Sequence, residues 1–262
     1  MNEEDFKKVS EVPHYLRDWV HSEEIYLALV TGTRPVYFQE HPDSFIWGSG
    51  SLFMIHFAGY DFALTARHVY TKSGAVPQHT RILFPGSRVA LPLAGGFFAQ
   101  FDGHENQEDV EDMCLLYVDK DKDHPAWADP EFPDYPVWKF EEHWVPAWLL
   151  DEGEQVFAVG YPTHEEKFDY DNSKLRELPL LVVGKLRKGS GKGIFKIDCA
   201  EFEDEIAGCS GGPVFARVQG HFVFIGMMTR GGATARTIHF VDSQHVYQFL
   251  KNAVTALEAK KD

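Results

Sequence analysis

The chain has 262 residues, of which 44% are hydrophobic and 14% aromatic, so it can form one large or two small domains with a real core. This composition excludes a disordered chain. The formal net charge at pH 7 is −15, from 40 acidic and 25 basic residues. That charge repels the phosphates of nucleic acids and anionic lipid surfaces, so we expect neither as a partner and expect cationic partners to be favoured.

The cysteines predict no disulfide framework, because Cys114, Cys199 and Cys209 are an odd and sparse set for so long a chain. Their scarcity favours a reducing compartment. The first 20 residues begin acidic and lack the apolar core of a secretory signal. No run approaches the roughly 18 apolar residues of a membrane span. We therefore expect a cytoplasmic protein that does not bind membranes.

Short strand-like segments dominate the chain after an N-terminal extension of residues 1–24, in which residues 4–20 could form a helix. The segments are apolar or alternate in polarity, and turn signals separate them. So many short strands favour an all-β sandwich or a pair of barrels. The predicted strands are residues 25–32, 51–58, 61–66, 113–118, 155–162, 179–186, 193–200, 212–218 and 221–229.

Residues 123–150 interrupt this pattern with five of the 14 prolines and four of the six tryptophans. Prolines at this density forbid a continuous helix or a central strand, so we interpret the segment as a connector packed against the body of the protein. An aromatic recognition surface is the alternative.

The final segment, residues 243–262, changes to helical spacing. Ser243 is the expected N-cap of an amphipathic helix. The apolar residues that recur on its inner face are Val246, Phe249, Leu250, Ala253 and Leu257.

The stretch EIAGCSGGPVF, residues 205–215, surrounds Ser210 with residues that carry little side chain. A plain turn would explain the glycines and proline, and so would a nucleophile whose neighbours must be backbone. A serine nucleophile needs a general base and a group that orients this base. His68 in ALTARHVY and Asp112 in EDMCLLYVD are candidates, because each adjoins an apolar strand-like run.

The blocks TARHV, DMCLL and GCSGGPV, in this order, resemble the three signature blocks of the trypsin-like serine peptidases of chymotrypsin fold. GSGSLF at 48–53 and GMMTRGG at 226–232 resemble further strands of that family. The pattern covers roughly residues 25–245, although the specific motifs are confined to the three short blocks. The resemblance implies two six-stranded antiparallel β-barrels and a C-terminal helix. The first barrel spans residues 25–122 with His68 and Asp112, and the second spans 151–242 with Ser210.

The resemblance also implies the roles of the site residues. Ser210 attacks a carbonyl carbon, His68 takes the serine proton, and Asp112 holds the histidine tautomer. The backbone N–H groups of Gly208 and Ser210 form the oxyanion hole. Alternatives within the chain are Asp109 or Glu111 in place of Asp112, and Cys209 in place of Ser210 as the nucleophile.

Substrate binding is inferred from the same resemblance. Asp204 lies six residues before Ser210, at the base of the primary pocket, where a carboxylate would select Arg or Lys side chains. Gly231 would keep the mouth of the pocket open, and the backbone of Thr229, Arg230 and Gly231 would pair with an extended peptide. The alternative is that the acidic run at 201–205 is a solvated loop.

Cys209 stands where the secreted members carry the aspartate that pairs with a new N-terminus, so the chain resembles the disulfide-free bacterial or intracellular branch. We expect a serine endopeptidase of protein or peptide substrates that needs no cofactor, with an unknown regulatory partner as a further possibility. The sequence contains neither an H-E-x-x-H nor a C-x-x-C spacing, so we predict no metal site. The alternatives are a catalytically silent peptide-binding protein and a hydrolase of esters or small amides.

Overall fold

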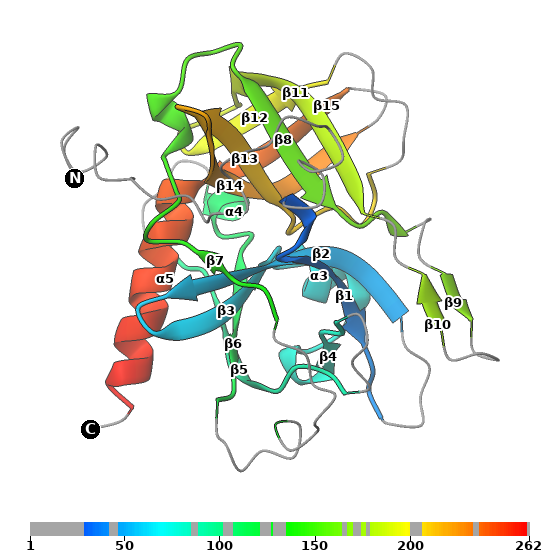
Figure 1. The fold of residues 1–262 in the computed structure, drawn as a ribbon. Coiled ribbons are helices and arrows are strands. Elements are labelled where there is room, and N and C mark those ends of the chain that lie inside the picture. Colours follow the sequence, from blue (N-terminus) through cyan, green and yellow to red (C-terminus); the bar gives the residue numbers. More distant parts are fainter. Residues whose placement is uncertain are drawn as a thin grey trace.

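Two β units stack one above the other, and the C-terminal helix runs along one side (Figure 1). The computed structural model describes residues 29–41, 47–84, 89–101, 107–120, 127, 135–163, 167–169, 174–176, 179–199, 206–232 and 236–260. The N-terminal extension and the helix expected at 4–20 lie outside these residues. The all-β fold class is confirmed, with a closed six-stranded barrel, a second sheet that is largely antiparallel and a C-terminal helix.

The first unit is a seven-stranded sheet with strand order β4-β1-β2-β3-β6-β5, in which β7 pairs with β2. All its ladders are antiparallel except the short pair of β7 with β2. Within the described ranges no ladder closes the sheet between β4 and β5, and β4 is only two residues long. The strands are β1 Thr33–Phe38, β2 Trp47–Phe57, β3 Tyr60–Thr65, β4 Thr80–Arg81, β5 Leu93–Phe98, β6 Cys114–Val118 and β7 Trp138–Lys139.

The second unit is the closed barrel, with strand order β11-β12-β15-β14-β13-β8. Each neighbouring pair is antiparallel. A separate two-stranded ribbon, β9 Lys167–Asp169 with β10 Lys174–Arg176, extends from its edge (Figure 1). The barrel strands are β8 Gln155–Gly160, β11 Leu180–Lys188, β12 Ile194–Asp198, β13 Pro213–Val218, β14 His221–Gly232 and β15 Thr237–Asp242.

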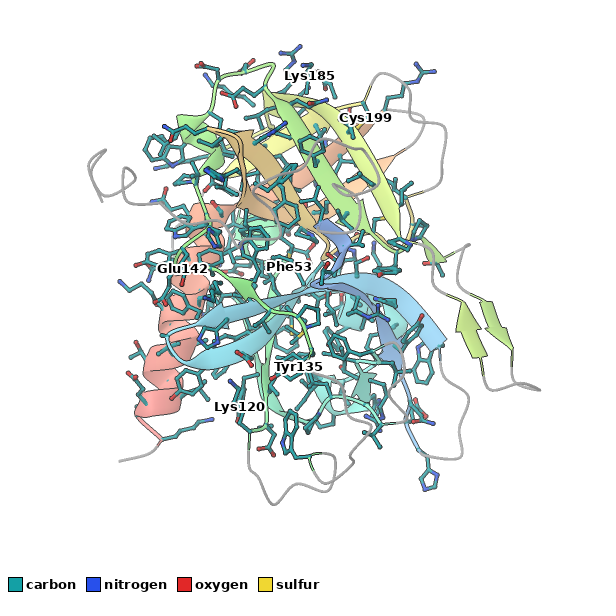
Figure 2. All side chains as sticks on the ribbon, in the orientation of Figure 1. Phe53, Lys120, Tyr135, Glu142, Lys185 and Cys199 are labelled. Carbon is teal, nitrogen blue, oxygen red and sulfur yellow. The ribbon has the colours of Figure 1, made fainter. Side chains whose placement is uncertain are left out.

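Aromatic side chains join the two units at their seam. The ring of Phe53 in β2 stacks on Phe224 of β14 with 5.6 Å between ring centroids, and its edge meets Phe215 of β13 at 5.5 Å. Trp138 lies 5.0 Å from Phe215. Figure 2 shows Phe53 between the upper and lower units. Each such aromatic pair stabilises the fold by about 0.5–1.5 kcal/mol beyond the effect of buried area. Phe53, Phe215, Phe224 and Trp138 all belong to the same hydrophobic core cluster.

The Pro- and Trp-rich segment supplies much of this seam. Trp138 and Trp144 are buried, and Trp144 stacks on Tyr247 of the C-terminal helix at 4.8 Å. Among the tryptophans of this segment, all of which are described, only Trp148 is exposed, at 56%. Most of these aromatic rings therefore pack inside the protein instead of forming a recognition surface.

The strand predicted at residues 25–32 is wrong where the structure describes it. Leu29 and Val30 are helical, residues 31–32 form a turn, and the first strand begins at Thr33. Leu29 is fully buried in the core, and its carbonyl accepts a hydrogen bond from the Thr33 hydroxyl at 3.4 Å. The apolar side chains that suggested a strand are therefore buried from a helical turn. Residues 25–28 lie outside the described part.

The C-terminal helix forms as predicted, as α5 Ser243–Glu258, but its N-cap is Asp242 instead of Ser243. The Asp242 carboxylate accepts the N–H of Gln244 at 2.6 Å and the N–H of Ala147 at 2.9 Å. A carboxylate is the stronger acceptor for helix N–H groups, while the Ser243 hydroxyl donates to the Val145 carbonyl at 2.8 Å.

Candidate active site

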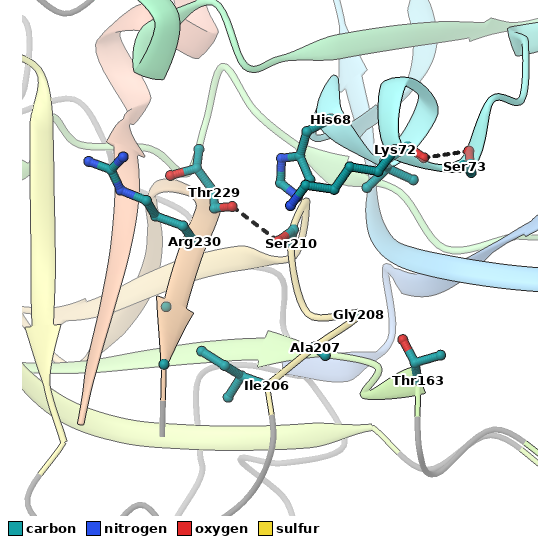
Figure 3. Close-up of a pocket in the computed structure, with 13 residues that line it drawn as sticks. His68, Lys72, Ser73, Thr163, Ile206, Ala207, Gly208, Ser210, Thr229 and Arg230 are labelled. Carbon is teal, nitrogen blue, oxygen red and sulfur yellow. Dashed lines mark hydrogen bonds between the residues drawn. The ribbon is translucent and has the colours of Figure 1, made fainter. Parts of the chain in front are cut away.

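A cleft of about 620 Å³ opens between the two units, and residues from both line it. His68 comes from the first unit, and Gly208, Ser210 and Thr229 come from the second. Figure 3 shows the ring of His68, the Ser210 hydroxyl and the backbone carbonyl of Thr229 close together in this cleft. The cleft therefore brings together residues up to 164 positions apart, from His68 to Gly232, since 232 − 68 = 164.

His68 and Asp112 meet because their strands are neighbours. β3 and β6 pair antiparallel with Thr65 opposite Cys114. The residues that follow Thr65 and those that precede Cys114 therefore lie at the same end of this strand pair. His68 begins the helix α3 His68–Ser73, and its Nδ1 lies 2.6 Å from Oδ2 of Asp112. Oδ1 of Asp112 accepts the backbone N–H of His68 at 2.8 Å. Since an ionised carboxylate only accepts, Nδ1 carries the proton and Nε2 is left as an acceptor.

The two rival acids have other partners. Oδ2 of Asp109 pairs with Nη2 of Arg230 at 2.9 Å, and Oε1 of Glu111 accepts the backbone N–H of Phe101 at 2.7 Å. Asp112 is thus the acid of the three that contacts His68.

Ser210 lies in the loop that leads into β13. Its hydroxyl donates to the carbonyl oxygen of Thr229 at 3.0 Å, and no hydrogen bond joins it to His68 within the described part of the chain. Figure 3 shows Ser210 between Thr229 and the ring of His68. A rotation about the Cα–Cβ bond is the motion that would turn the hydroxyl from the carbonyl to the imidazole.

The N–H groups of Gly208 and Ser210 are turned by their own peptide planes. The Ala207 carbonyl accepts Thr163 N–H at 2.8 Å, and the Cys209 carbonyl accepts Gly212 N–H at 3.0 Å. No described peptide bond is cis, so each N–H points opposite to its carbonyl, away from these partners. Neither N–H donates a hydrogen bond within the described residues. Both residues line the cleft, so these two amides are the candidate donors to a bound oxyanion.

Gly208 must be glycine in this loop. Its φ is +98°, and a Cβ there would lie 2.5 Å from Oγ1 of Thr163 and 2.6 Å from the carbonyl oxygen of Tyr161. The left-handed backbone and the crowding both exclude a side chain.

Cys209 is a poor candidate nucleophile. Its side chain is 3% exposed, and burial raises the pKa of the thiol to about 12, so the reactive thiolate is disfavoured. All three cysteines are free and buried.

The edge of β14 beyond Met228 is open on the side facing the cleft. β13 pairs with β14 only as far as Met227, and the loop before β13 adds two hydrogen bonds at Met228. β15 covers the other edge through Arg230 and Gly231. Among the described residues no strand pairs with the first edge from Thr229 to Gly232, so an extended peptide could add there.

The predicted substrate residues are placed as follows. Thr229, Arg230 and Gly231 line the cleft, although the Arg230 side chain is engaged with Asp109. Gly231 leaves room for the side chain of Ile206, whose Cδ1 a Cβ at 231 would strike. Asp204 lies outside the described residues.

Sequence reasoning missed two residues that shape the loop. Thr163 holds the Ala207 carbonyl, and Ser51 holds the carbonyls of Gly208 and Ser210. Ser51 lies within the GSGSLF block, which was the available signal. Within the described part of the chain no group of three His, Cys, Asp or Glu residues could hold a metal ion. No helix there is long and apolar enough to cross a bilayer.

No family model matches the sequence, and no curated protein matches it. Solved structures do match. Human heparin binding protein is 12% identical, with a TM-score of 0.56 over 86% of this chain and 92% of that chain. A double mutant of the same human protein gives 11% identity and a TM-score of 0.55, with the same coverages. An atomic-resolution structure of heparin binding protein is 11% identical, with a TM-score of 0.54 over 86% of this chain and 91% of that chain. The chain thus has a chymotrypsin-like fold, and likeness at this identity shows the fold alone.

Proposed function

We propose that the protein is a serine endopeptidase in which Ser210 is the nucleophile, His68 the general base and Asp112 the residue that orients the base. One observation supports this proposal above all. The same cleft contains an imidazole bound to a carboxylate, a serine hydroxyl, and two backbone amides that have no hydrogen-bond acceptor among the described residues. This set supplies what acyl transfer needs: a base, a nucleophile and donors for the developing oxyanion.

In the proposed reaction the peptide pairs with the open edge of β14. A backbone N–H of the peptide donates to the Thr229 carbonyl oxygen in place of Ser210. The Ser210 hydroxyl is then free to turn toward Nε2 of His68. Oγ attacks the carbonyl carbon as His68 takes the proton, and the oxyanion meets the N–H groups of Gly208 and Ser210. His68 then protonates the leaving amine, and a water repeats the sequence on the acyl-enzyme. Each amide donor contributes about 2.7–4 kcal/mol to lowering the barrier.

The test is labelling followed by turnover. A fluorophosphonate probe should modify Ser210, as read by mass spectrometry of the digested protein, and the unlabelled protein should cleave casein or a peptide mixture. If a variant without the Ser210 hydroxyl cleaved these substrates as fast as the parent protein, the proposal would be refuted.

A second candidate, a peptide-binding protein without turnover, is favoured by one observation. The Ser210 hydroxyl rests on the Thr229 carbonyl and not on His68. That protein would bind extended peptides but resist the fluorophosphonate. A hydrolase of esters or small amides would be labelled yet would leave casein intact, so a panel of the three substrate types separates it.

The finer assignments extend this proposal. Cytoplasmic residence and kinship with the disulfide-free branch are supported by three buried, unpaired cysteines. Heparin is a polyanion, and the formal net charge of −15 disfavours carrying that ligand over from the human protein.

We predict cleavage after Arg and Lys through Asp204. Asp204→Ala should lower kcat/KM at these residues at least about tenfold, because loss of a desolvated charge partner costs roughly 2 kcal/mol or more. A proteome-derived peptide library read by mass spectrometry measures the preference. Glu201→Ala, in the same acidic run, is the control and should leave the cleavage pattern unchanged. An identical pattern in the Asp204 variant would assign specificity to other residues.

Gly208→Ala should lower kcat about 10²- to 10³-fold, the effect of losing one oxyanion donor. The added Cβ would meet Thr163 and Tyr161 and would turn the 207–208 peptide. Gly220→Ala is the matched control, because φ there is +87° but nothing lies within 4 Å of the added Cβ. Both variants bear similar backbone strain, so kcat and thermal unfolding measured together isolate the effect on the amide. Parent-like kcat in Gly208→Ala would place the oxyanion elsewhere.

A further inference from the structure

Ser51 lies in β2 with no exposed surface, and it makes hydrogen bonds to the loop that carries Gly208 and Ser210. Its hydroxyl donates to the carbonyl of Gly208 at 2.9 Å and accepts the N–H of Tyr161 at 2.8 Å. Its own N–H donates to the carbonyl of Ser210 at 2.9 Å. Its carbonyl accepts the hydroxyl of Thr65 at 2.6 Å. Ser51 therefore ties a strand of the first unit to the nucleophile loop of the second.

We infer that Ser51 is a positioning residue that holds the two oxyanion amides in place, an inference that rests on the proposed function. Gly208 and Ser210, which carry the two proposed oxyanion N–H groups, are also the two residues whose carbonyls accept hydrogen bonds from Ser51.

The peptide planes explain why this matters. Thr163 fixes the plane between residues 207 and 208, and Gly212 fixes the plane between 209 and 210. The plane between them carries the Gly208 carbonyl, and the Ser51 hydroxyl is its hydrogen-bond donor within the described chain. The N–H of Cys209 in the same plane donates to the Ile206 carbonyl at 3.0 Å, so two hydrogen bonds fix this middle plane, which links the planes of the two amides. Ser51 therefore helps to hold the segment of the loop that connects the two amides.

A purely structural role is the competing explanation, because buried hydroxyl groups need partners. Ser243 offers the comparison within the same chain. It is equally buried, and its hydroxyl donates to one carbonyl, that of Val145, at 2.8 Å. Ser243 makes this bond at the start of α5, and it is not among the residues that line the cleft. A structural role predicts like effects of Ser51→Ala and Ser243→Ala.

Steady-state kinetics on the full chain distinguishes the two. Ser51→Ala should lower kcat about 10- to 100-fold with KM nearly unchanged, somewhat less than loss of one donor outright. Ser243→Ala should keep the parent kcat. Affinity for a peptidyl boronic acid, which mimics the tetrahedral intermediate, should fall with kcat in Ser51→Ala, while affinity for the same peptide as a carboxylate product should hold. The pH profile should keep its midpoint, because the contact between His68 and Asp112 is untouched.

Two conservative variants keep the test decisive if Ser51→Ala folds poorly. Ser51→Thr retains the hydroxyl and should restore most of kcat, and Ser51→Cys, with its weaker donor, should give an intermediate value. Equal losses in Ser51→Ala and Ser243→Ala, or equal weakening of boronate and product, would overturn the inference while leaving the endopeptidase intact. A parent protein without turnover or labelling would overturn the proposed function, and this inference with it.

Discussion

Ser210→Ala is expected to lower kcat by about 10⁴- to 10⁶-fold, because it removes the hydroxyl that we propose forms the acyl-enzyme while the amides and the cleft remain. The fold should survive. The lost hydroxyl makes one hydrogen bond, to the Thr229 carbonyl, and such a bond contributes only about 0.5–1.5 kcal/mol. Hydrolysis of a peptide identified in the library screen, followed alongside thermal unfolding, measures both effects.

Ser243→Ala is again the matched control, because it removes the same atom from a hydroxyl that also donates to one carbonyl. It should leave kcat unchanged. A Ser210 variant with parent-like kcat, or one whose loss of activity matches its loss of folded protein, would remove the basis for a serine nucleophile.

Asp112→Asn should lower kcat about 10⁴-fold. The carboxylate accepts both the backbone N–H of His68 and the proton on Nδ1. An amide has one oxygen, and with that oxygen on the backbone N–H its NH₂ group faces Nδ1. The ring then moves its proton to Nε2 and cannot accept one from Ser210. Kinetics at pH 7 and fluorophosphonate labelling rates should fall together.

The chain contains a second pair of the same geometry. Nδ1 of His56 lies 2.6 Å from Oδ1 of Asp61, at the β2–β3 hairpin, and Asp61 also binds Tyr135 and Lys120. Asp61→Asn should therefore reduce stability without reducing kcat. If Asp112→Asn and Asp61→Asn lost the same small amount of activity, the carboxylate of Asp112 would have only a structural role.

The parts of the site that depend on local pattern could be predicted from the sequence. His68 and Asp112 each adjoin a strand that an apolar segment of the sequence predicts, and pairing of β3 with β6 brings them together. The preference for Asp112 over Asp109 followed from the apolar run at 113, and the structure pairs Asp109 with Arg230 instead.

The remaining features depend on contacts that no local pattern contains. The bond from Ser51 to Gly208 joins residues 157 positions apart, and the carbonyl that holds the Ser210 hydroxyl is 19 residues downstream. Strands were missed where small or cyclic residues interrupt the pattern, as with Pro35 in β1 and with Gly95 and Gly96 in β5. Pairing with β2 and β6 keeps these segments extended in spite of the proline and the glycines.

Because Phe53 packs on Phe215 and Phe224, one hydrophobic cluster extends through both β units, beside a second cluster that lies mainly within the barrel. Unfolding of either unit would expose part of this shared cluster to water. Denaturation is therefore expected to be cooperative, in one step. Cutting the gene between the halves would yield two fragments that each expose part of this aromatic interior, and neither fragment would contain the whole chemistry.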